Sequence, residues 1–143
     1  MSVLVDTPVW SLALRRRAQQ LNAAERRQVD EWRALVAEGR VRLTGIIRQE
    51  VLSGIRDTRD FERLRERLDA FEDLAAETAD HERAAAFFNA CRAKGISPGA
   101  IDVLICAVAA RHGLAIFTTD ADFARYAAVL PLRLHRPSEA RHG

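Results

Sequence analysis

The sequence predicts an α/β fold in which helices flank a central parallel sheet. Short apolar runs at residues 2–5 and 114–117 have the length and composition of buried strands. Longer stretches, whose apolar residues recur at helical spacing, separate such runs along the chain. Strands that alternate with helices pair in parallel through right-handed crossovers, so we expect a layered α/β domain.

The first elements are marked by apolar runs and by helix-start residues. Residues 2–5 are expected to form a strand, and a short helix follows, with Thr7 as its N-cap and Pro8 in its first turn. Residues 22–38 repeat apolar positions at helical spacing, and Asn22 is a suitable N-cap.

The remaining elements follow the same two patterns. A strand is expected at 41–43, helices at 46–55, 58–70, 79–94 and 98–112, a short edge strand within the ambiguous stretch 71–76, a strand at 114–117, a short helix at 122–128 and a last strand at 132–134.

Length and composition indicate one soluble domain. The 143 residues correspond to a single domain, which we place at residues 1–137, followed by a polar tail at 138–143. The hydrophobic share of 48% is enough for a core, which must be mostly aliphatic because aromatic residues make up only 6%. Cys91 and Cys106 are too few for a disulfide framework, so buried thiols and a cytoplasmic location are expected. No signal peptide or membrane span is expected.

Arginine is concentrated in the first half of the chain, and Lys94 is the only lysine. The planar guanidinium matches phosphate, so this usage suits a nucleic-acid surface. Many of these arginines also have acidic neighbours at helical spacing, so a solvated, ion-paired face remains the alternative. The arginines concerned include Arg15, Arg16, Arg17, Arg26, Arg27, Arg56, Arg59, Arg63, Arg65 and Arg67.

Four carboxylates occupy positions that a parallel sheet would bring together. Asp6 and Asp120 each follow the carboxyl end of a strand candidate, where ligands bind in open sheets of this kind. Asp102 stands in the first turn of a helix, and Glu50 lies among apolar residues. Each has a purely structural alternative, because acids also end strands, cap helices and face solvent on helix rims.

Together these acids predict a divalent-metal site. Carboxylates that share one crevice raise one another's pKa unless a cation neutralises them. Ligation by oxygen alone suits Mg²⁺ or Mn²⁺. Zinc is disfavoured, because the four histidines and two cysteines show no paired ligand spacing. A metal-activated water is the expected nucleophile of such a site on phosphate esters.

Four segments of the chain resemble the PIN-domain ribonucleases, and most closely the VapC-type toxins of type II toxin-antitoxin pairs. Their order and spacing agree along nearly the whole chain, and the four together are far more specific than any one. The segments are residues 3–10 (VLVDTPVW), 50–54 (EVLSG), 101–109 (IDVLICAVA) and 117–123 (FTTDADF).

The resemblance implies a Rossmann-like PIN fold that hydrolyses RNA endonucleolytically with Mg²⁺ or Mn²⁺. Asp120 is favoured as the last acid, although the variable spacing of that segment leaves Asp122 open. Pro8 replaces a small polar residue but preserves the helix start. By this resemblance the catalytic positions are Asp6, Glu50, Asp102 and Asp120, the metal ligands are Asp6, Asp102 and Asp120, and the supporting residues are Thr7, Thr118 and Asp122.

The resemblance also implies partners. These are a cognate VapB-type antitoxin, whose C-terminal segment places a basic side chain near the acids, an RNA substrate such as transfer or ribosomal RNA, and a second copy of the chain in a homodimer. Trp10, Trp32 and the apolar face of residues 46–68 are candidates for the antitoxin groove, and core packing explains them equally well.

Three other functions compete with this interpretation. A PIN-like scaffold that binds RNA or a protein without cleavage is the main alternative. A phosphatase of the haloacid dehalogenase type needs a second acid where this chain has Pro8. A receiver domain needs a lysine after the strand at residues 114–117, and none follows it.

Overall fold

The computed structural model describes residues 1–137, and the polar tail expected at 138–143 lies outside the described residues. Strands alternate with helices, as the sequence predicts. In chain order the elements are β1 (Val3–Val5), α1 (Thr7–Leu14), a 3₁₀ turn η1 (Ala18–Gln20), α2 (Ala23–Ala37), β2 (Val41–Thr44), α3 (Gly45–Leu52), α4 (Thr58–Leu68), β3 (Asp73–Leu74), α5 (Thr78–Ala93), α6 (Ala100–His112), β4 (Ala115–Phe117), α7 (Asp122–Ala127) and β5 (Arg133–Leu134).

The five strands form one parallel sheet in the order β3-β2-β1-β4-β5. Central β1 pairs with β2 through Leu4 and Arg42 and with β4 through Val5 and Phe117. From β1 the chain moves to β2 and β3 on one side, and later returns to β4 and β5 on the other. The strand order therefore reverses between β1 and β4, and in open sheets of this kind ligands bind at the carboxyl ends of the strands beside such a reversal.

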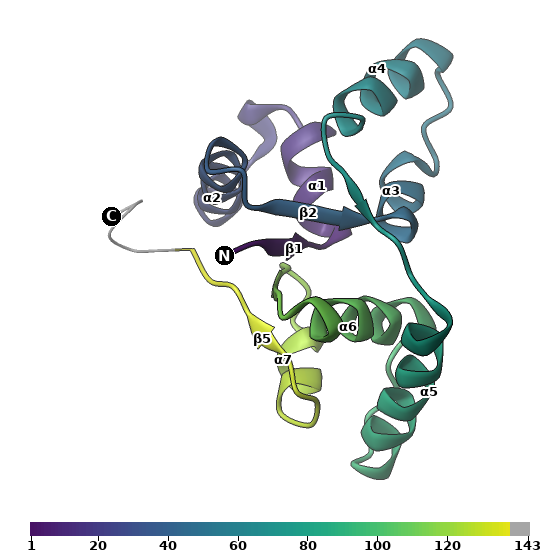
Figure 1. The fold of residues 1–143 in the computed structure, drawn as a ribbon. Helices are drawn as coiled ribbons and strands as arrows, with labels where there is room; N and C mark the ends of the chain where they lie inside the picture. The colour runs from purple at the N-terminus through teal and green to yellow at the C-terminus, as the bar shows by residue number, and fades with distance from the viewer. Residues whose placement is uncertain (138–143) are drawn as a thin grey trace.

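Two layers of helices cover the sheet. Helices α1, α2, α3 and α4 lie on one side of the strands, and α5, α6 and α7 lie on the other (Figure 1). This division follows from right-handed crossovers, because connections that run in opposite directions along a parallel sheet place their helices on opposite faces. The fold is the α/β arrangement that the sequence predicts.

The core is aliphatic with a small aromatic cluster, and this corrects one expectation. Trp10 and Trp32 are 0% and 8% exposed, and their rings meet edge to face with centroids 5.6 Å apart. The ring of Phe71 lies 4.9 Å from that of Trp10. Both tryptophans therefore belong to the core, and the idea that they line an antitoxin groove is wrong.

Several local predictions are confirmed. Asn22 caps α2, since its side chain accepts a hydrogen bond from the Glu25 amide. The stretch 71–76 contains β3, which lies at the edge of the sheet as expected. Cys91 and Cys106 are free and buried thiols.

Within residues 1–137 the structure contains no helix of the length and apolarity that a bilayer crossing requires.

Of the boundaries that differ from the predictions, two bear on the site. Asp6, rather than Thr7, occupies the N-cap position of α1, so Thr7 begins the helix and its hydroxyl is free to bond elsewhere. Helix α3 ends at Leu52 instead of continuing to residue 55, because Ser53 is extended and Gly54 has a φ of 86°. Glycine adopts that left-handed conformation without the steric cost that a Cβ would add.

Candidate functional site

Asp6 and Thr118 lie side by side at the carboxyl ends of β1 and β4. Val5 pairs with Phe117, and the amide of Asp6 donates to the Phe117 carbonyl at 2.8 Å, which extends the ladder by one step. The Thr118 hydroxyl then donates to Asp6 Oδ2 at 2.8 Å. Parallel register therefore places the first predicted acid against a residue that is 112 positions later in the chain.

Glu50 joins the same edge of the sheet through α1. The hydroxyl of Thr7, in the first turn of α1, donates to Glu50 Oε1 at 2.8 Å. Glu50 is half-buried in α3, which packs against α1. The Glu50 carboxylate therefore turns toward the start of α1, while the residue remains partly exposed.

Asp102 comes from the opposite layer of helices. It stands in the first turn of α6, where the helix dipole favours a negative charge. Its Oδ2 accepts a hydrogen bond of 2.9 Å from the hydroxyl of Tyr126, a buried residue of α7. Sequence reasoning missed Tyr126, and the only signal was that it is the single tyrosine in the chain.

The loop after β4 holds the last acids, and the structure distinguishes the two candidates. The Asp120 amide donates to Thr118 Oγ1 at 3.0 Å, and Asp120 Oδ1 accepts from the Asp122 amide at 2.9 Å. Asp120 is half-buried, whereas Asp122 is exposed and lies 3.7 Å from the guanidinium of Arg125. The side chain of Asp120 therefore also helps to start α7, in agreement with its structural alternative.

Burial and like charge act together on these acids. Desolvation raises the pKa of Asp6 to about 6, and the charges of Asp102 and Glu50 act in the same direction, against the hydrogen bond from Thr118. Desolvation also raises the pKa of Asp102, with further contributions from Asp120 and Glu50. The carboxylates from β1, α3, α6 and the β4–α7 loop therefore lie close enough to repel one another.

No cation of the described chain relieves this repulsion. Among residues 1–137, no arginine, lysine or histidine forms an ion pair with the four acids Asp6, Glu50, Asp102 and Asp120. In the same part of the chain, no three His, Cys, Asp or Glu side chains converge closely enough to enclose a metal ion.

This donor set fits a hydrated divalent cation better than a fully enclosed one. Mg²⁺ keeps several waters and binds through one or two carboxylates together with substrate phosphates, so three converging carboxylates are not required. The donors here are all oxygen atoms, and within residues 1–137 their negative charge has no cationic partner. The residues present therefore suit Mg²⁺ or Mn²⁺ and do not suit zinc.

Comparison with known proteins identifies the family. The family model for the PIN domain matches residues 3–129 of the sequence. The chain belongs to the PIN-domain family. This membership confirms the resemblance that the sequence motifs carry and decides against the phosphatase and receiver alternatives. No curated protein matches the chain.

Several solved structures have a similar fold, and one of them is a toxin-antitoxin complex. FitAcB from Neisseria gonorrhoeae is 25% identical, with a TM-score of 0.74, and the alignment covers 94% of this PIN domain chain and 97% of the other. A toxin-antitoxin complex from Klebsiella pneumoniae is 22% identical (TM-score 0.69, coverage 96% and 99%). VapBC2 from Rickettsia felis, bound to a promoter DNA fragment, is 17% identical (TM-score 0.70, coverage 94% and 98%). The last two show the shared fold alone.

Proposed function

We propose that this PIN domain is a metal-dependent endoribonuclease, the toxin of a type II toxin-antitoxin pair. PIN domains are generally nucleases, and similar folds occur in toxin-antitoxin complexes. The observation that carries the proposal is a set of carboxylates from both layers of helices, near the point where the strand order reverses, that raise one another's pKa and have no cationic partner within residues 1–137.

Asp6, Asp102 and Asp120 are the proposed metal ligands. Asp6 and Asp102 are held by the Thr118 and Tyr126 hydroxyls, so each presents a carboxylate in a fixed orientation. A bound Mg²⁺ or Mn²⁺ would neutralise these acids, activate a water molecule and stabilise charge on the phosphate. Asp120 is preferred to Asp122, because it contributes more to the raised pKa of Asp102 and Asp122 has Arg125 beside it.

Glu50 is proposed to accept the proton of the attacking water. The Thr7 hydroxyl occupies Glu50 Oε1, which fixes the carboxylate and leaves Oε2 as the acceptor. In the hydrolysis the water oxygen forms a bond to phosphorus, the bond from phosphorus to the leaving oxygen breaks, and solvent protonates that oxygen. The roles of Thr7 and Thr118 are to orient acids.

The proposed partners follow from the same assignment. A VapB-type antitoxin would inhibit the toxin by placing a basic side chain among the acids, which lack one of their own. RNA, such as transfer or ribosomal RNA, is the proposed substrate, and a homodimer in the cytoplasm is the proposed working form. Truncation of the antitoxin's C-terminal segment should release nuclease activity, and inhibition that persists would contradict this part of the proposal.

The test is cleavage of total RNA by purified, antitoxin-free protein with Mg²⁺ or Mn²⁺. Wild-type protein should produce fragments that disappear with EDTA and with the isosteric variant Asp6→Asn. A second readout is independent of activity, since Mg²⁺ should raise the melting temperature of wild type more than that of Asp6→Asn. End mapping of the fragments would identify the target.

The result that contradicts the proposal is equally specific. If wild type and Asp6→Asn, both folded, leave RNA intact with either metal, the catalytic assignment fails. A non-cleaving scaffold that binds RNA or a protein then becomes the better function.

A further inference from the structure

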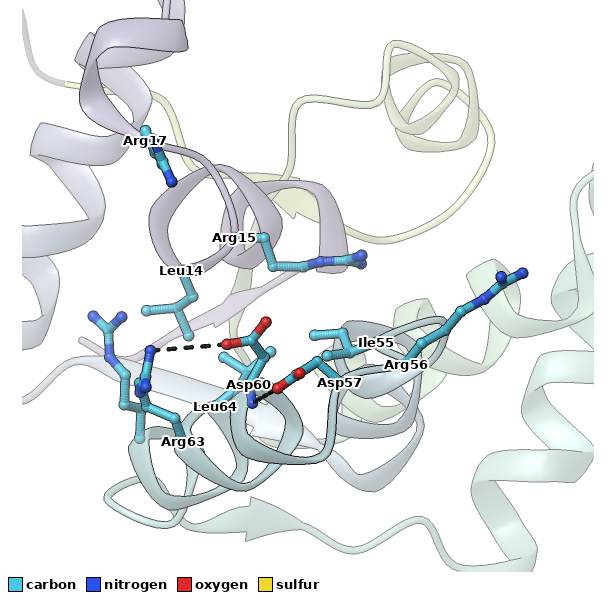
Figure 2. A pocket seen from close by; sticks show the side chains of 10 residues that line it. Leu14, Arg15, Arg17, Ile55, Arg56, Asp57, Asp60, Arg63 and Leu64 are labelled. Carbon is cyan, nitrogen blue, oxygen red and sulfur yellow. Dashed lines mark hydrogen bonds and ion pairs between the residues drawn. The ribbon is translucent and has the colours of Figure 1, made fainter.

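A second feature of the surface lies away from the acids. It is a groove of about 540 Å³ between the end of α1, the loop after α3 and one face of α4 (Figure 2). Ten residues line it, and half of them are arginines. They are Leu14, Arg15, Arg17, Ile55, Arg56, Asp57, Asp60, Arg63, Leu64 and Arg67.

The positive charge of this groove is not neutralised by the groove itself. Five arginines face two aspartates, which leaves a formal charge of +3. Asp57 is engaged in capping α4, since it accepts a hydrogen bond from the Asp60 amide. Asp60 lies 3.8 Å from Arg63, and within residues 1–137 the other four arginines form no ion pair.

Arg65, another arginine of α4, forms ion pairs that most arginines of the groove lack. Arg65 does not line the groove, and it pairs with Glu62 at 2.9 Å and with Asp69 at 3.2 Å. The ion-paired alternative that the sequence left open therefore holds for Arg65, and among the groove arginines it holds only for Arg63, which lies near Asp60. Unpaired like charges repel one another, so their concentration in one groove suits an anionic ligand.

Three apolar side chains lie among the charged ones in the groove. Leu14, Ile55 and Leu64 contribute to its lining, and no aromatic side chain does. Figure 2 shows the Arg15 side chain reaching across the groove, while the Arg56 side chain points away from Ile55. A mixed lining of this kind can contact both the phosphates of a polynucleotide and its less polar sugars and bases.

The groove and the acids share two helices. Helix α1 starts beside Asp6 and ends at Leu14, and α3 carries Glu50 and leads into Ile55. The eight residues of α1 span about 12 Å at the usual rise of a helix. The groove therefore lies about one helix length from Asp6, at the other end of α1.

We propose that this arginine groove is an RNA exosite, which binds the phosphates of single-stranded RNA on one side of the cleavage point. The inference rests on the proposed function for its substrate. An acidic peptide is the competing occupant. RNA is favoured, because it is the proposed substrate of this domain and guanidinium groups pair with its phosphates.

The exosite is tested by binding, in the absence of cleavage. The probe is a fluorescein-labelled 20-mer of uridine, titrated with Asp6→Asn protein in EDTA at several salt concentrations. In this background the double variants Arg56→Gln with Arg67→Gln, and Arg15→Gln with Arg17→Gln, remove charge from opposite walls of the groove. Each should raise the Kd at least fivefold and reduce the salt dependence, by about 1.4 in the logarithmic slope for two lost phosphate contacts.

The matched control loses the same charge from the same helix. Arg59→Gln with Arg65→Gln alters two α4 arginines that do not line the groove, and it should change the Kd less than twofold. Circular dichroism and melting temperatures establish that every variant is folded. If both groove variants bind the probe as tightly as the control, the exosite is overturned.

Two further outcomes have defined meanings. If the groove variants keep their affinity for RNA but lose affinity for a 20-mer of glutamate, the groove is a peptide site and the RNA exosite is wrong. If wild type cleaves no RNA but the groove variants still lose binding selectively, the exosite stands while the proposed nuclease fails. The two proposals can therefore fail separately.

Discussion

Two buried aspartates in this PIN domain have opposite electrostatic environments. Asp6 and Asp80 are 4% and 1% exposed, and each lies at the start of a helix. The Arg111 guanidinium donates to both oxygens of Asp80, at 2.9 and 3.0 Å, and this lowers the pKa of that carboxyl. Burial and, to a smaller extent, the nearby charges of Asp102 and Glu50 raise the pKa of Asp6 to about 6.

The comparison shows that burial alone does not define the role of an acid. Asp80 is neutralised within the chain, since its bonds to Arg111 join α5 to α6, and it also accepts from the Glu77 amide at the start of α5. Asp6 has the same degree of burial but no cationic partner among the described residues, so its ionised form is costly until something external neutralises it. A buried acid left without a counterion is a candidate for function.

The largest expected effect is on cleavage. Asp6→Asn should reduce metal-dependent RNA cleavage at least a hundredfold, on the order of 3 kcal/mol in the barrier, because it removes a proposed metal ligand. Asp80→Asn is the matched substitution, and it should retain activity within threefold at temperatures where it is folded. Rates on one labelled RNA under single-turnover conditions test this, and equal losses in the two variants would contradict the distinction.

The same pair of substitutions should shift stability in opposite directions. Each pKa unit corresponds to about 1.4 kcal/mol, so ionising Asp6 in the folded, metal-free protein costs up to about 3 kcal/mol. At pH 8, Asp6→Asn should therefore raise the free energy of unfolding by part of this cost. Asp80→Asn should lower the free energy of unfolding by roughly 2 kcal/mol, because it weakens charge-assisted hydrogen bonds. Urea unfolding in EDTA measures both, and shifts of the same sign would refute the comparison.

The pH dependence sharpens the account of Asp6. Its pKa is raised from 3.8 to about 6 on folding, so between these values the folded state holds more protons than the unfolded state. The stability of metal-free wild type should therefore fall, relative to Asp6→Asn, as pH rises from about 4 to about 6, and the difference should level off above pH 7. Unfolding curves at pH 4, 5, 6 and 8 test this, and a constant difference would show that Asp6 is not perturbed.

The smallest effect concerns the hydroxyl that holds Asp102. Tyr126→Phe removes one hydrogen bond to Oδ2 while keeping the buried ring, so we expect a loss of about 1 kcal/mol in stability. Cleavage should fall only severalfold, because the carboxylate remains but is less well oriented. Thermal melts and the same single-turnover assay measure the two effects, and unchanged values in both would remove Tyr126 from the site.

Sequence reasoning succeeded where a local hydrophobic pattern also determines which distant residues lie together in the sheet. The apolar runs and helical spacings located every strand and α-helix to within a few residues, because each element carries its own periodic pattern. Parallel pairing then predicted that Asp6 and the residues after β4 share one edge of the sheet, and the contact between Asp6 and Thr118 agrees with that. These inferences require only that the strands pair in parallel.

Other features have no local signal. Thr7 reads as a helix cap in the sequence, but its hydroxyl bonds to Glu50, which is 43 residues away. Trp10 and Trp32 are equally suited to an interface or to a core, and only the packing of α1 on α2 decides for the core. The bond from Tyr126 to Asp102 depends on how α7 and α6 meet.

The sequence by itself therefore determined the α/β fold, the order of its elements and the acids that could meet in one crevice, because hydrophobic periodicity and strand-end position are properties of the chain alone. Only the tertiary structure decided which charges have partners. Asp80 lies against Arg111, Asp6 lies near other acids, and four of the five arginines of one groove have no ion pair within residues 1–137. Pairing depends on contacts between distant segments, and those contacts exist only once the helices have packed on the sheet.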